Sequence, residues 1–600
     1  MFQDPPPSHT VLLGEALQCS AAQVAALLQT ADMGETLDAE LTAAVLDQTQ
    51  RFASEQLAPL RRSGDESGCR MGPQGVATPA GWPQAYQALV DAQWLALGFP
   101  EAIGGQGLPW PLACAMHELL AKANVAFALG GILTNGACHL LQAFAAPAVK
   151  ARYLPHLVTG HWAGTMCLTE PQAGSDLRLV RALVKQDQQG NWRLWGTKIF
   201  ISYGEHDLTE NIVHLVLARQ EGAGNGYAGL GVYLVPRFIE QEQGSGGQGA
   251  AAPDSWQANA VRCTRLENKM GLHGSPTCEL LFDGAWCIPL TQPGEGLAVM
   301  FSMMNLERLL VAVQALGVAQ GALEQAWDYA MNRCQGRISH AADEAAPIVG
   351  HADVQRMLRH MEILVGGCRM LLLQAAWLLQ AADHAPQEAT RHKARACFEL
   401  LVPVVKSFVT DAAIDVANTA IQVWGGHGYI RDNGIEQYLR DVRVMAIYEG
   451  TNGIQAMDLV RRKLARDEGA AVKVLLDEID RDVAAAPAVA SGLRRGVVVL
   501  REWIAALGAA RGQGKGFVVE YCAADLLRSL GALLLCAGWI RLAHQGTEAG
   551  VASRARLLAD EAQSTWMPLV TAAHERFKSL WAQGSLGVGG QEHTRRPQQG

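Results

Sequence analysis

One block of the chain, residues 163–285, differs in texture from the rest and constrains the fold more than any other feature. It holds short runs rich in β-branched and aromatic residues, such as WRLWGTKIFIS and NIVHLVLAR, separated by Gly, Asn and Pro. Such runs predict strands. On both sides of it, stretches rich in Ala and Leu carry apolar residues at spacings of three and four, which predict amphipathic helices. We therefore expect an α+β fold that is mainly α, with a β module between helical blocks.

These differences in residue pattern divide the chain into six segments. We expect an N-terminal extension, a helical domain, a small β-barrel or sheet, a second helical bundle, an additional helical domain and a disordered tail, at residues 1–35, 36–162, 163–285, 286–465, 466–582 and 583–600. A Gly/Ser/Gln-rich insertion, QEQGSGGQGAAAPDS, predicts a mobile loop in the β module. Cofactor sites are common at junctions between domains, so the borders of the β module are the places to search.

Composition excludes several classes of protein. The net charge is −9 and the pI is about 6.0, which argues against a broad nucleic-acid surface. The longest apolar runs are short or interrupted, so we expect buried helices and no membrane span. The sequence has no HExxH or GxSxG motif and no metal-ligand spacing. Thirteen cysteines without a CxxC pair, and a start without a signal-peptide pattern, predict a cytoplasmic protein.

A single carboxylate stands out in AIYEGTNGIQ, residues 446–455. Glu449 follows an aromatic residue, Tyr448, and precedes a run of small and polar residues that starts with Gly450. The segment joins two stretches with helical patterns, so the acid is expected on a short flexible joint.

Two other segments are candidate cofactor contacts. MCLTEPQAGSDL, residues 166–177, joins the helical block to the β module, and its hydroxyls and freed N–H groups could hold a polar heterocycle or a diphosphate. In GTKIFISYGEHD, Phe200 and Ser202 are two residues apart on a strand, so both are expected on one face. An ordinary turn and a core phenylalanine are the alternatives. IQVWGGHGYIRD is not a dinucleotide fingerprint, because a helix and not a strand precedes its glycines.

Taken together, MCLTEPQAGSDL, GTKIFIS, NLERLLVAVQALGVAQGALEQA, IQVWGGHGYIRD and IYEGTNGIQ resemble the acyl-CoA dehydrogenase family over about residues 40–465. NKMGLHGSPTCEL and the extra C-terminal helices resemble a long branch of it that includes 3-methylmercaptopropionyl-CoA dehydrogenases. The resemblance implies an N-terminal helical bundle, a middle β-barrel and a C-terminal four-helix bundle. It also implies FAD, an acyl-CoA substrate, an electron-transferring flavoprotein as electron acceptor, and a homo-oligomer, which we expect to be a dimer.

The resemblance also assigns residues. It implies that Glu449 is the base that removes the Cα proton while the flavin N5 accepts the Cβ hydride, giving the trans-2-enoyl-CoA. It implies a set of cofactor-binding residues: Thr169, Ser175, Phe200, Ser202, Arg333, Gln422, Gly426 and Thr451. It implies a set of substrate-binding residues: Ser175, Asn305, Arg308, Tyr448 and Gly450.

The sequence departs from the family pattern at several positions. Phe200 stands where many members have Trp, and Gly453 where many have Gln. Glu307, in NLERLL, stands where some members place the base instead, so this chain has an acid at both positions; a helix residue paired with a nearby arginine is the alternative. Short or medium acyl-CoAs, including 3-methylthiopropanoyl-CoA, are the expected substrates. An oxygen-using acyl-CoA oxidase and a non-catalytic flavoprotein are the competing functions.

Overall fold

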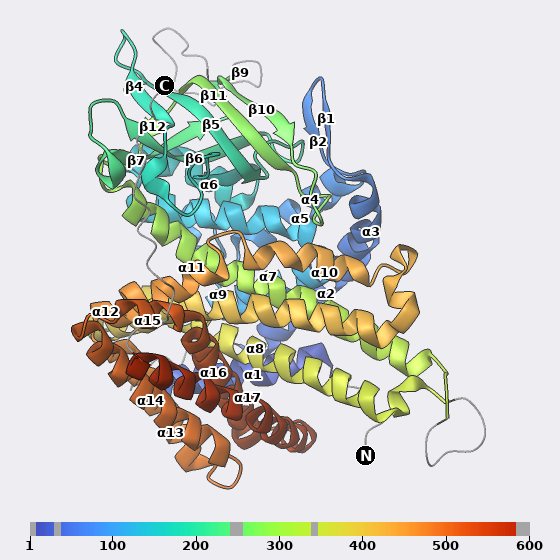
Figure 1. Cartoon of the computed structure of the whole chain (residues 1–600). Coiled ribbons are helices and arrows are strands. Elements are labelled where there is room, and N and C mark those ends of the chain that lie inside the picture. Colours follow the sequence, from blue (N-terminus) through green and yellow to red (C-terminus); the bar gives the residue numbers. More distant parts are fainter. Residues whose placement is uncertain (1–7, 29–37, 241–255, 338–345, 584–600) are drawn as a thin grey trace, which may run out of the picture.

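A computed structural model describes residues 8–28, 38–240, 256–337 and 346–583. It places a sheet domain against a helical body made of several packed layers (Figure 1). The order of helices, strands and helices along the chain confirms the predicted fold class. The predicted mobile insertion, 241–255, and nearly all of the predicted tail lie outside the described residues.

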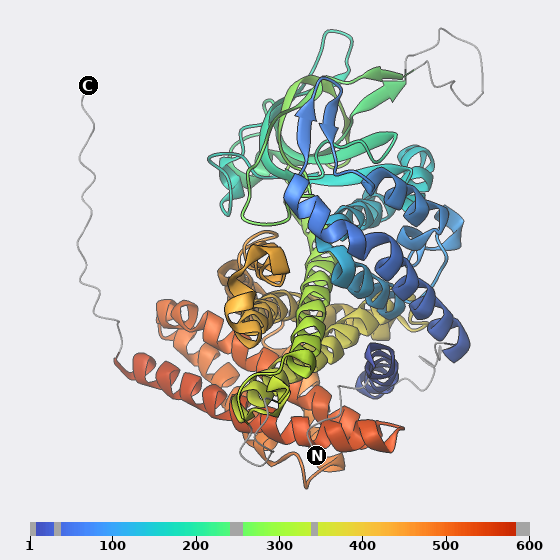
Figure 2. The ribbon, with the colours of Figure 1, turned by 90° about the vertical axis from the view of Figure 1, so that its right-hand side faces the viewer.

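Of the N-terminal helices, the first packs on the helical body away from the sheet, and the others lie beside the sheet and the central bundle (Figure 2). They comprise α1 (His9–Leu28), α2 (Ala39–Phe52), the π-helical turn η1 (Ala53–Leu57), α3 (Ala58–Ser67), the β1–β2 hairpin (Arg70–Gly72, Gly75–Ala77), α4 (Trp82–Asp91), α5 (Trp110–Phe144) and α6 (Pro147–Thr159). The long helix α5 bends where the backbone of Asn124 is non-helical. There the Asn124 side-chain oxygen accepts the N–H of Phe127 at 3.2 Å, which caps the second half of the helix.

The middle domain is an eight-stranded sheet in the order β10-β11-β5-β4-β6-β7-β12, with β3 paired to β6. Its strands are β3 (Trp162–Cys167), β4 (Leu183–Gln186), β5 (Trp192–Ser202), β6 (Asn211–Gln220), β7 (Leu230–Pro236), β10 (Val261–Leu266), β11 (Thr277–Trp286) and β12 (Ile288–Pro289), and β8 (Phe238–Glu240) pairs separately with β9 (Trp256–Ala258). Side chains from six of these strands, among them Val184, Leu194, Val216 and Phe282, form a core of their own. The sheet thus wraps around its own interior, as the side chains of a small barrel do.

The helices that follow the sheet form the central bundle. They comprise α7 (Gly296–Asn332), α8 (Ala352–His384), α9 (Glu388–Trp424), α10 (Glu436–Val442), α11 (Asn452–Asp458), the π-helical turn η11 (Leu459–Lys463) and α12 (Leu464–Arg466). Helix α7 packs along both α5 and α9, and α8 packs along α9. Helix α7 is covered by the sheet domain on one side and by helices on the other. Most of its residues are therefore buried and apolar.

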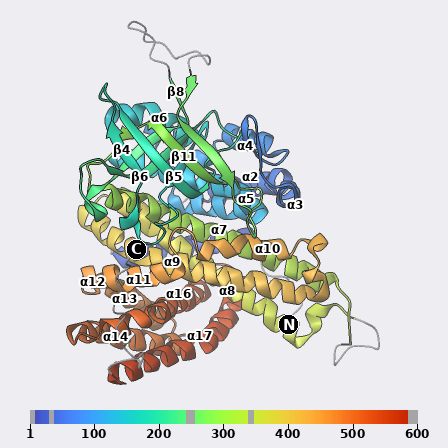
Figure 3. The same ribbon diagram turned by 45° about the horizontal axis from the view of Figure 1, so that its top comes forward.

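The last helices form a further layer on the opposite side of the bundle from the sheet (Figure 3). They comprise α13 (Ala470–Ala485), α14 (Ser491–Gly512), α15 (Gly516–Tyr521), α16 (Ala523–Gln545) and α17 (Ala549–Gln583). Trp539 of α16 donates its indole N–H to the carbonyl of Ile363 at 3.0 Å. It lies so close to α8 that a Cβ at Gly366 would come within 2.4 Å of its ring. Direct packing of this kind makes the layer part of one body with the bundle.

Four helices, α5, α7, α8 and α16, are long and apolar enough to cross a membrane by length and composition alone. The expectation that the apolar runs are too short to span is therefore wrong by length, because the runs belong to longer helices. The expectation of buried helices is confirmed: between 72% and 100% of each apolar window lies inside the protein.

Candidate functional site

Glu449 lies in a loop that connects the 3₁₀ turn η10 (Arg443–Ala446) to α11. Its backbone is left-handed, with φ at 56°, and Gly450 follows with φ at 87°. A left-handed conformation is uncommon for a residue with a side chain and costs free energy. Glycine is favoured next to it, because residues with a Cβ rarely adopt the φ of 87° found at position 450. Such a conformation is kept only where the surrounding structure demands it.

Side chains from three helices impose this conformation on the loop. Arg308 of α7 donates to the Glu449 carbonyl at 3.1 Å, and Gln455 of α11 donates to the same carbonyl at 3.2 Å. Lys406 of α9 donates to the Gly450 carbonyl at 2.9 Å. The two carbonyl groups are thereby held by buried donors, so the strained loop is fixed from outside.

Glu449 is partly buried, and the Oε2 atom of its carboxyl group is fully buried. Burial raises the pKa of Glu449, and the positive charges of Arg308 and Lys406 act in the opposite direction. Burial also lowers the pKa of Lys406 to about 7. A carboxylate with a raised pKa in a site shielded from water is a better proton acceptor than one in solution.

Glu307 lies beside Glu449 and not beside an arginine partner. Its side chain is 0% exposed, and it packs on Gly136 of α5, where a Cβ would come within 2.6 Å of Oε1. Burial, followed by the charge and the hydrogen bond of Glu449, raises the pKa of Glu307 well above its usual value. Among the described residues, neither of its oxygens accepts a hydrogen bond from an N–H group. The predicted ion pair with an arginine is therefore not formed.

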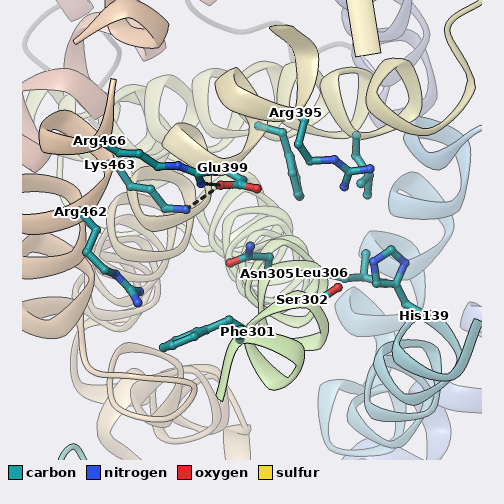
Figure 4. A pocket seen from close by; sticks show the side chains of 13 residues that line it. His139, Phe301, Ser302, Asn305, Leu306, Arg395, Glu399, Arg462, Lys463 and Arg466 are labelled. Carbon is teal, nitrogen blue, oxygen red and sulfur yellow. Dashed lines mark hydrogen bonds and ion pairs between the residues drawn. The ribbon is translucent and has the colours of Figure 1, made fainter. Parts of the chain in front are cut away.

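A cavity of about 320 Å³ lies between α5, α7, α8, α9 and the η11–α12 segment (Figure 4), and neither Glu307 nor Glu449 is among its lining residues. Asn305 and Leu306, which precede Glu307 on α7, line it. The guanidinium of Arg462 lies over the Phe301 ring at 4.4 Å. The other charged groups of its wall are Arg395, Glu399, Lys463 and Arg466. His139 also lines it, and burial lowers the pKa of this imidazole. With four basic side chains and one carboxylate, the cavity suits an anionic ligand.

The cofactor residues predicted on the sheet lie at one of its edges. The carbonyl of Thr169 accepts the N–H of Ile199 at 2.9 Å, which holds the 166–177 loop against β5. Phe200 is left-handed, with φ at 60°, and its ring is 59% exposed. Ser175 is exposed and Ser202 is partly buried.

Strict alternation, which was the basis for placing Phe200 and Ser202 on one face, does not hold at this edge. The register with β11 shifts between Cys278 and Leu280, opposite this stretch of β5. A bulge adds an unpaired residue and re-aims the neighbouring side chains. An exposed aromatic ring at such a bulge still offers a surface to a flat ligand.

Three of the other predicted cofactor residues lie near the ends of α7 and α9, and Thr451 lies at the start of α11. Gln422 and Gly426 are exposed, and a Cβ at Gly426 would meet no atom within 4 Å. Tyr329 stacks on Trp424 and shares a hydrogen bond of 2.9 Å with His427, so it ties the two helix ends together. Arg333 lies one turn beyond Tyr329 and is exposed. Thr451 has a local role as well, because its hydroxyl accepts the N–H of Ile454 and caps α11.

Sequence reasoning missed Lys406, Gln455 and Gly136. Lys406 was detectable in principle, because it is a lone charge inside the apolar run LVPVVKSFV, and a buried lysine usually has a specific partner. Gln455 and Gly136 carry no such signal, because their roles depend on contacts with other helices.

The sequence matches models of a known protein family over most of its length. The acyl-CoA dehydrogenase N-terminal, middle and C-terminal domain models match residues 40–161, 165–285 and 294–464. A 3-methylmercaptopropionyl-CoA dehydrogenase from Ruegeria pomeroyi is 42% identical over 427 residues, covering 71% of each chain. The broad-specificity linear acyl-CoA dehydrogenase FadE5 from Mycobacterium tuberculosis is 34% identical over 478 residues, covering 75% of this chain and 74% of that one.

Solved structures resemble the fold over most of the chain. An acyl-CoA dehydrogenase from Bacillus anthracis, complexed with FAD, has a TM-score of 0.74 at 18% identity, covering 92% of this chain and 90% of that one. ACDH-11 from Caenorhabditis elegans, in complex with C11-CoA, has a TM-score of 0.73 at 19% identity, covering 96% and 94%. Both matches extend beyond the three family domains, so the additional C-terminal helices are included in the likeness of fold.

Proposed function

The chain belongs to the acyl-CoA dehydrogenase family, and from this premise we propose that it oxidises a short- or medium-chain acyl-CoA to the trans-2-enoyl-CoA with Glu449 as the base. The observation that carries the proposal is the Glu449 loop. The Glu449 backbone is held in a strained conformation by buried side chains that donate to its carbonyl group, and burial raises the pKa of its carboxyl group. Strain and a perturbed pKa at the same residue are typical of a catalytic site.

The chemistry requires a base on one side of the acyl chain. The Cα–H bond breaks, and its proton moves to a Glu449 carboxylate oxygen as the Cα–Cβ double bond forms. Bound FAD supplies the acceptor for the hydride that leaves Cβ. The backbone N–H of Glu449 is a candidate donor to the thioester oxygen, where it would make the Cα proton more acidic. Arg308 acts on the same loop, because it holds the Glu449 carbonyl.

The cavity lined by Phe301, Asn305 and Arg462 is the proposed entrance for the substrate. Its basic side chains suit the phosphate groups of coenzyme A, and Asn305 connects its wall to the turn of α7 that carries Glu307. Lys463 and Arg466 are paired with Glu399 at 3.2 and 3.4 Å. Arg395 is paired with Asp383 at 2.5 Å and Arg462 with Asp458, so each of the four basic groups has a carboxylate partner. The identity with the Ruegeria pomeroyi enzyme makes 3-methylmercaptopropionyl-CoA the first substrate to test.

The described residues fit FAD in two groups. The exposed Phe200 ring, with Thr169, Ser175 and Ser202, suits the flat flavin ring, and the open backbone at Gly426, with Gln422 and Arg333, suits the adenine-diphosphate part. The two groups lie on different elements of one chain. We propose a homodimer in which the second group contributes to the cofactor site of the neighbouring copy. An electron-transferring flavoprotein is the proposed acceptor, and the cytoplasm is the proposed location.

The test is anaerobic bleaching of the flavin by a panel of acyl-CoAs. The purified protein should be yellow, and at least one acyl-CoA should bleach it rapidly. Glu449→Gln should keep the visible flavin spectrum but bleach at least 100-fold more slowly, since loss of a general base costs about 10²–10⁴ in rate. Glu399→Gln is the matched control; it removes a carboxylate of the cavity wall and should leave the bleaching rate at saturating substrate unchanged. A colourless protein, or full bleaching by Glu449→Gln, would contradict the proposal.

A further inference from the structure

The two acids of the site, Glu307 and Glu449, are within hydrogen-bonding reach of each other. They come from different parts of the chain, one from α7 and one from the loop before α11. The described residues give Glu307 no N–H donor, and its side chain has no exposure to solvent. Two ionised carboxylates cannot share such a place, because their repulsion is not screened by water. One of the two must therefore hold a proton.

The neighbouring charges decide which acid is ionised. Arg308 places a positive charge near both acids, and Lys406, whose pKa burial lowers to about 7, adds one near Glu449 alone at and below that pH. Arg308 also has Asp458 at 4.0 Å on its other side. Tyr448 is the remaining titratable group that faces the pair; its hydroxyl is buried, and burial raises its pKa, so it stays neutral. The negative charge of the pair thus belongs on Glu449.

We propose that Glu307 is a positioning residue that carries a proton and donates it in a hydrogen bond to the Glu449 carboxylate, holding the base ionised and turned toward the substrate. The packing of Glu307 on Gly136 supports this role. Because a Cβ at Gly136 would overlap the carboxyl group, the glycine provides the space in which Glu307 reaches Glu449. The inference rests on the proposed function, since it concerns the base of that reaction.

The proton count follows from this arrangement. Before reaction the pair holds one proton, on Glu307. When the Cα–H bond of the substrate breaks, its proton becomes the second one, on Glu449, and the electron pair of that bond enters the new double bond. The pair is then neutral, and the hydrogen bond from Glu307 weakens because its acceptor no longer carries a charge. Glu307 keeps its own proton throughout.

The first test needs no substrate. Infrared spectra of the purified wild-type holoenzyme and of its variants are compared at about pH 8. The wild-type spectrum should contain the C=O stretch of a buried, protonated carboxylic acid. At this pH Asp441, whose pKa burial raises to about 6, is ionised. The band should disappear in Glu307→Gln and remain in Glu399→Gln. Absence of the band from the wild-type protein, or its survival in Glu307→Gln, would overturn the proposal.

The second test is the pH profile of kcat/KM. Glu307→Gln keeps an N–H donor for Glu449, so its acid limb should stay within about twofold of wild type. Glu307→Leu fills the same space without a donor. Its kcat/KM should fall about tenfold or more on the acid limb and recover at higher pH, because a hydrogen bond to a charged group has about that effect. A purely structural role would lower kcat/KM equally at all pH values, and that result would refute the proposal.

The two proposals fail in different ways. If no acyl-CoA bleaches the wild-type flavin but the infrared band is present and depends on Glu307, the proposed function fails while the proton-sharing pair stands. If Glu307→Gln stops bleaching and Glu449→Gln does not, Glu307 is the base, and both proposals are wrong. The visible flavin spectrum of each variant identifies any that has not folded, and Glu307→Gln, which differs by one atom type, is the variant least prone to that.

Discussion

The ion pair between Lys198 and Glu170 under the cofactor loop gives the sharpest stability prediction. Lys198 is 0% exposed and Glu170 is 4% exposed. The lysine donates to Glu170 at 2.8 Å and to the carbonyl of Leu168 at 2.8 Å. The carboxylate also accepts the N–H groups of Arg181 and Ala182 at 2.7 and 2.9 Å. The pair therefore joins the 166–177 loop to β5 and to the segment just before β4.

Replacing Lys198 by Met would leave a buried carboxylate without its cation. Breaking a buried ion pair in this way costs about 3–5 kcal/mol. The two backbone donors remain, so we expect a value near the lower end, about 3 kcal/mol for the local opening of this region. That free energy corresponds to roughly 100-fold faster amide exchange. FAD should also bind more weakly, because the loop carries Thr169 and Ser175.

Hydrogen exchange with mass spectrometry, on peptides that cover residues 166–202, measures this opening directly. The double variant Lys198→Met/Glu170→Gln should recover a large part of the loss, because no unpaired charge is left buried. Lys185→Met, on the neighbouring strand β4, is the control. It should change exchange little, since Lys185 is partly exposed and its ammonium lies over the Trp195 ring at 5.2 Å. Wild-type exchange in Lys198→Met would refute the reasoning.

Two further predictions concern pH. Burial lowers the pKa of Lys406 from 10.5 to about 7. Between these values the unfolded chain binds more protons than the folded one, so the free energy of unfolding should rise with pH. In thermal melts from pH 7 to 10, the melting temperature of Lys406→Met should rise less than that of the wild type, and an identical rise would contradict the assignment. Burial lowers the pKa of His206 and of His214 from 6.5 to about 3, so both stay neutral in the folded sheet domain and stability should fall as the pH drops from 6.5 toward 3. Urea unfolding of His214→Gln should show a shallower fall, and an unchanged slope would mean that the histidine is already charged in the folded protein.

The order of helices and strands could be predicted from the sequence because it depends on near neighbours. Apolar spacings of three and four mark α5, α7 and α9, and the β-branched runs mark β5 and β6. The same local reasoning failed at Phe200, because the bulge there depends on the register of the partner strand β11. It also missed the length of the apolar helices, since residues of intermediate polarity that interrupt the runs become buried only through packing.

The functional site, too, was partly predictable from near neighbours in the sequence and partly dependent on tertiary packing. The sequence by itself determined that a single acid, Glu449, would lie on a glycine-containing joint between helical segments, because this depends only on residues that are consecutive in the chain. Only the tertiary structure decided that Glu307, far away in the chain, would meet that acid, and that Lys406 and Arg308 would hold its loop. A contact between distant residues depends on how closely two helices approach, and here that approach is set by packing and by a glycine on a third helix. The protonation state of the acid pair follows from that packing, because burial determines how strongly the two charges repel.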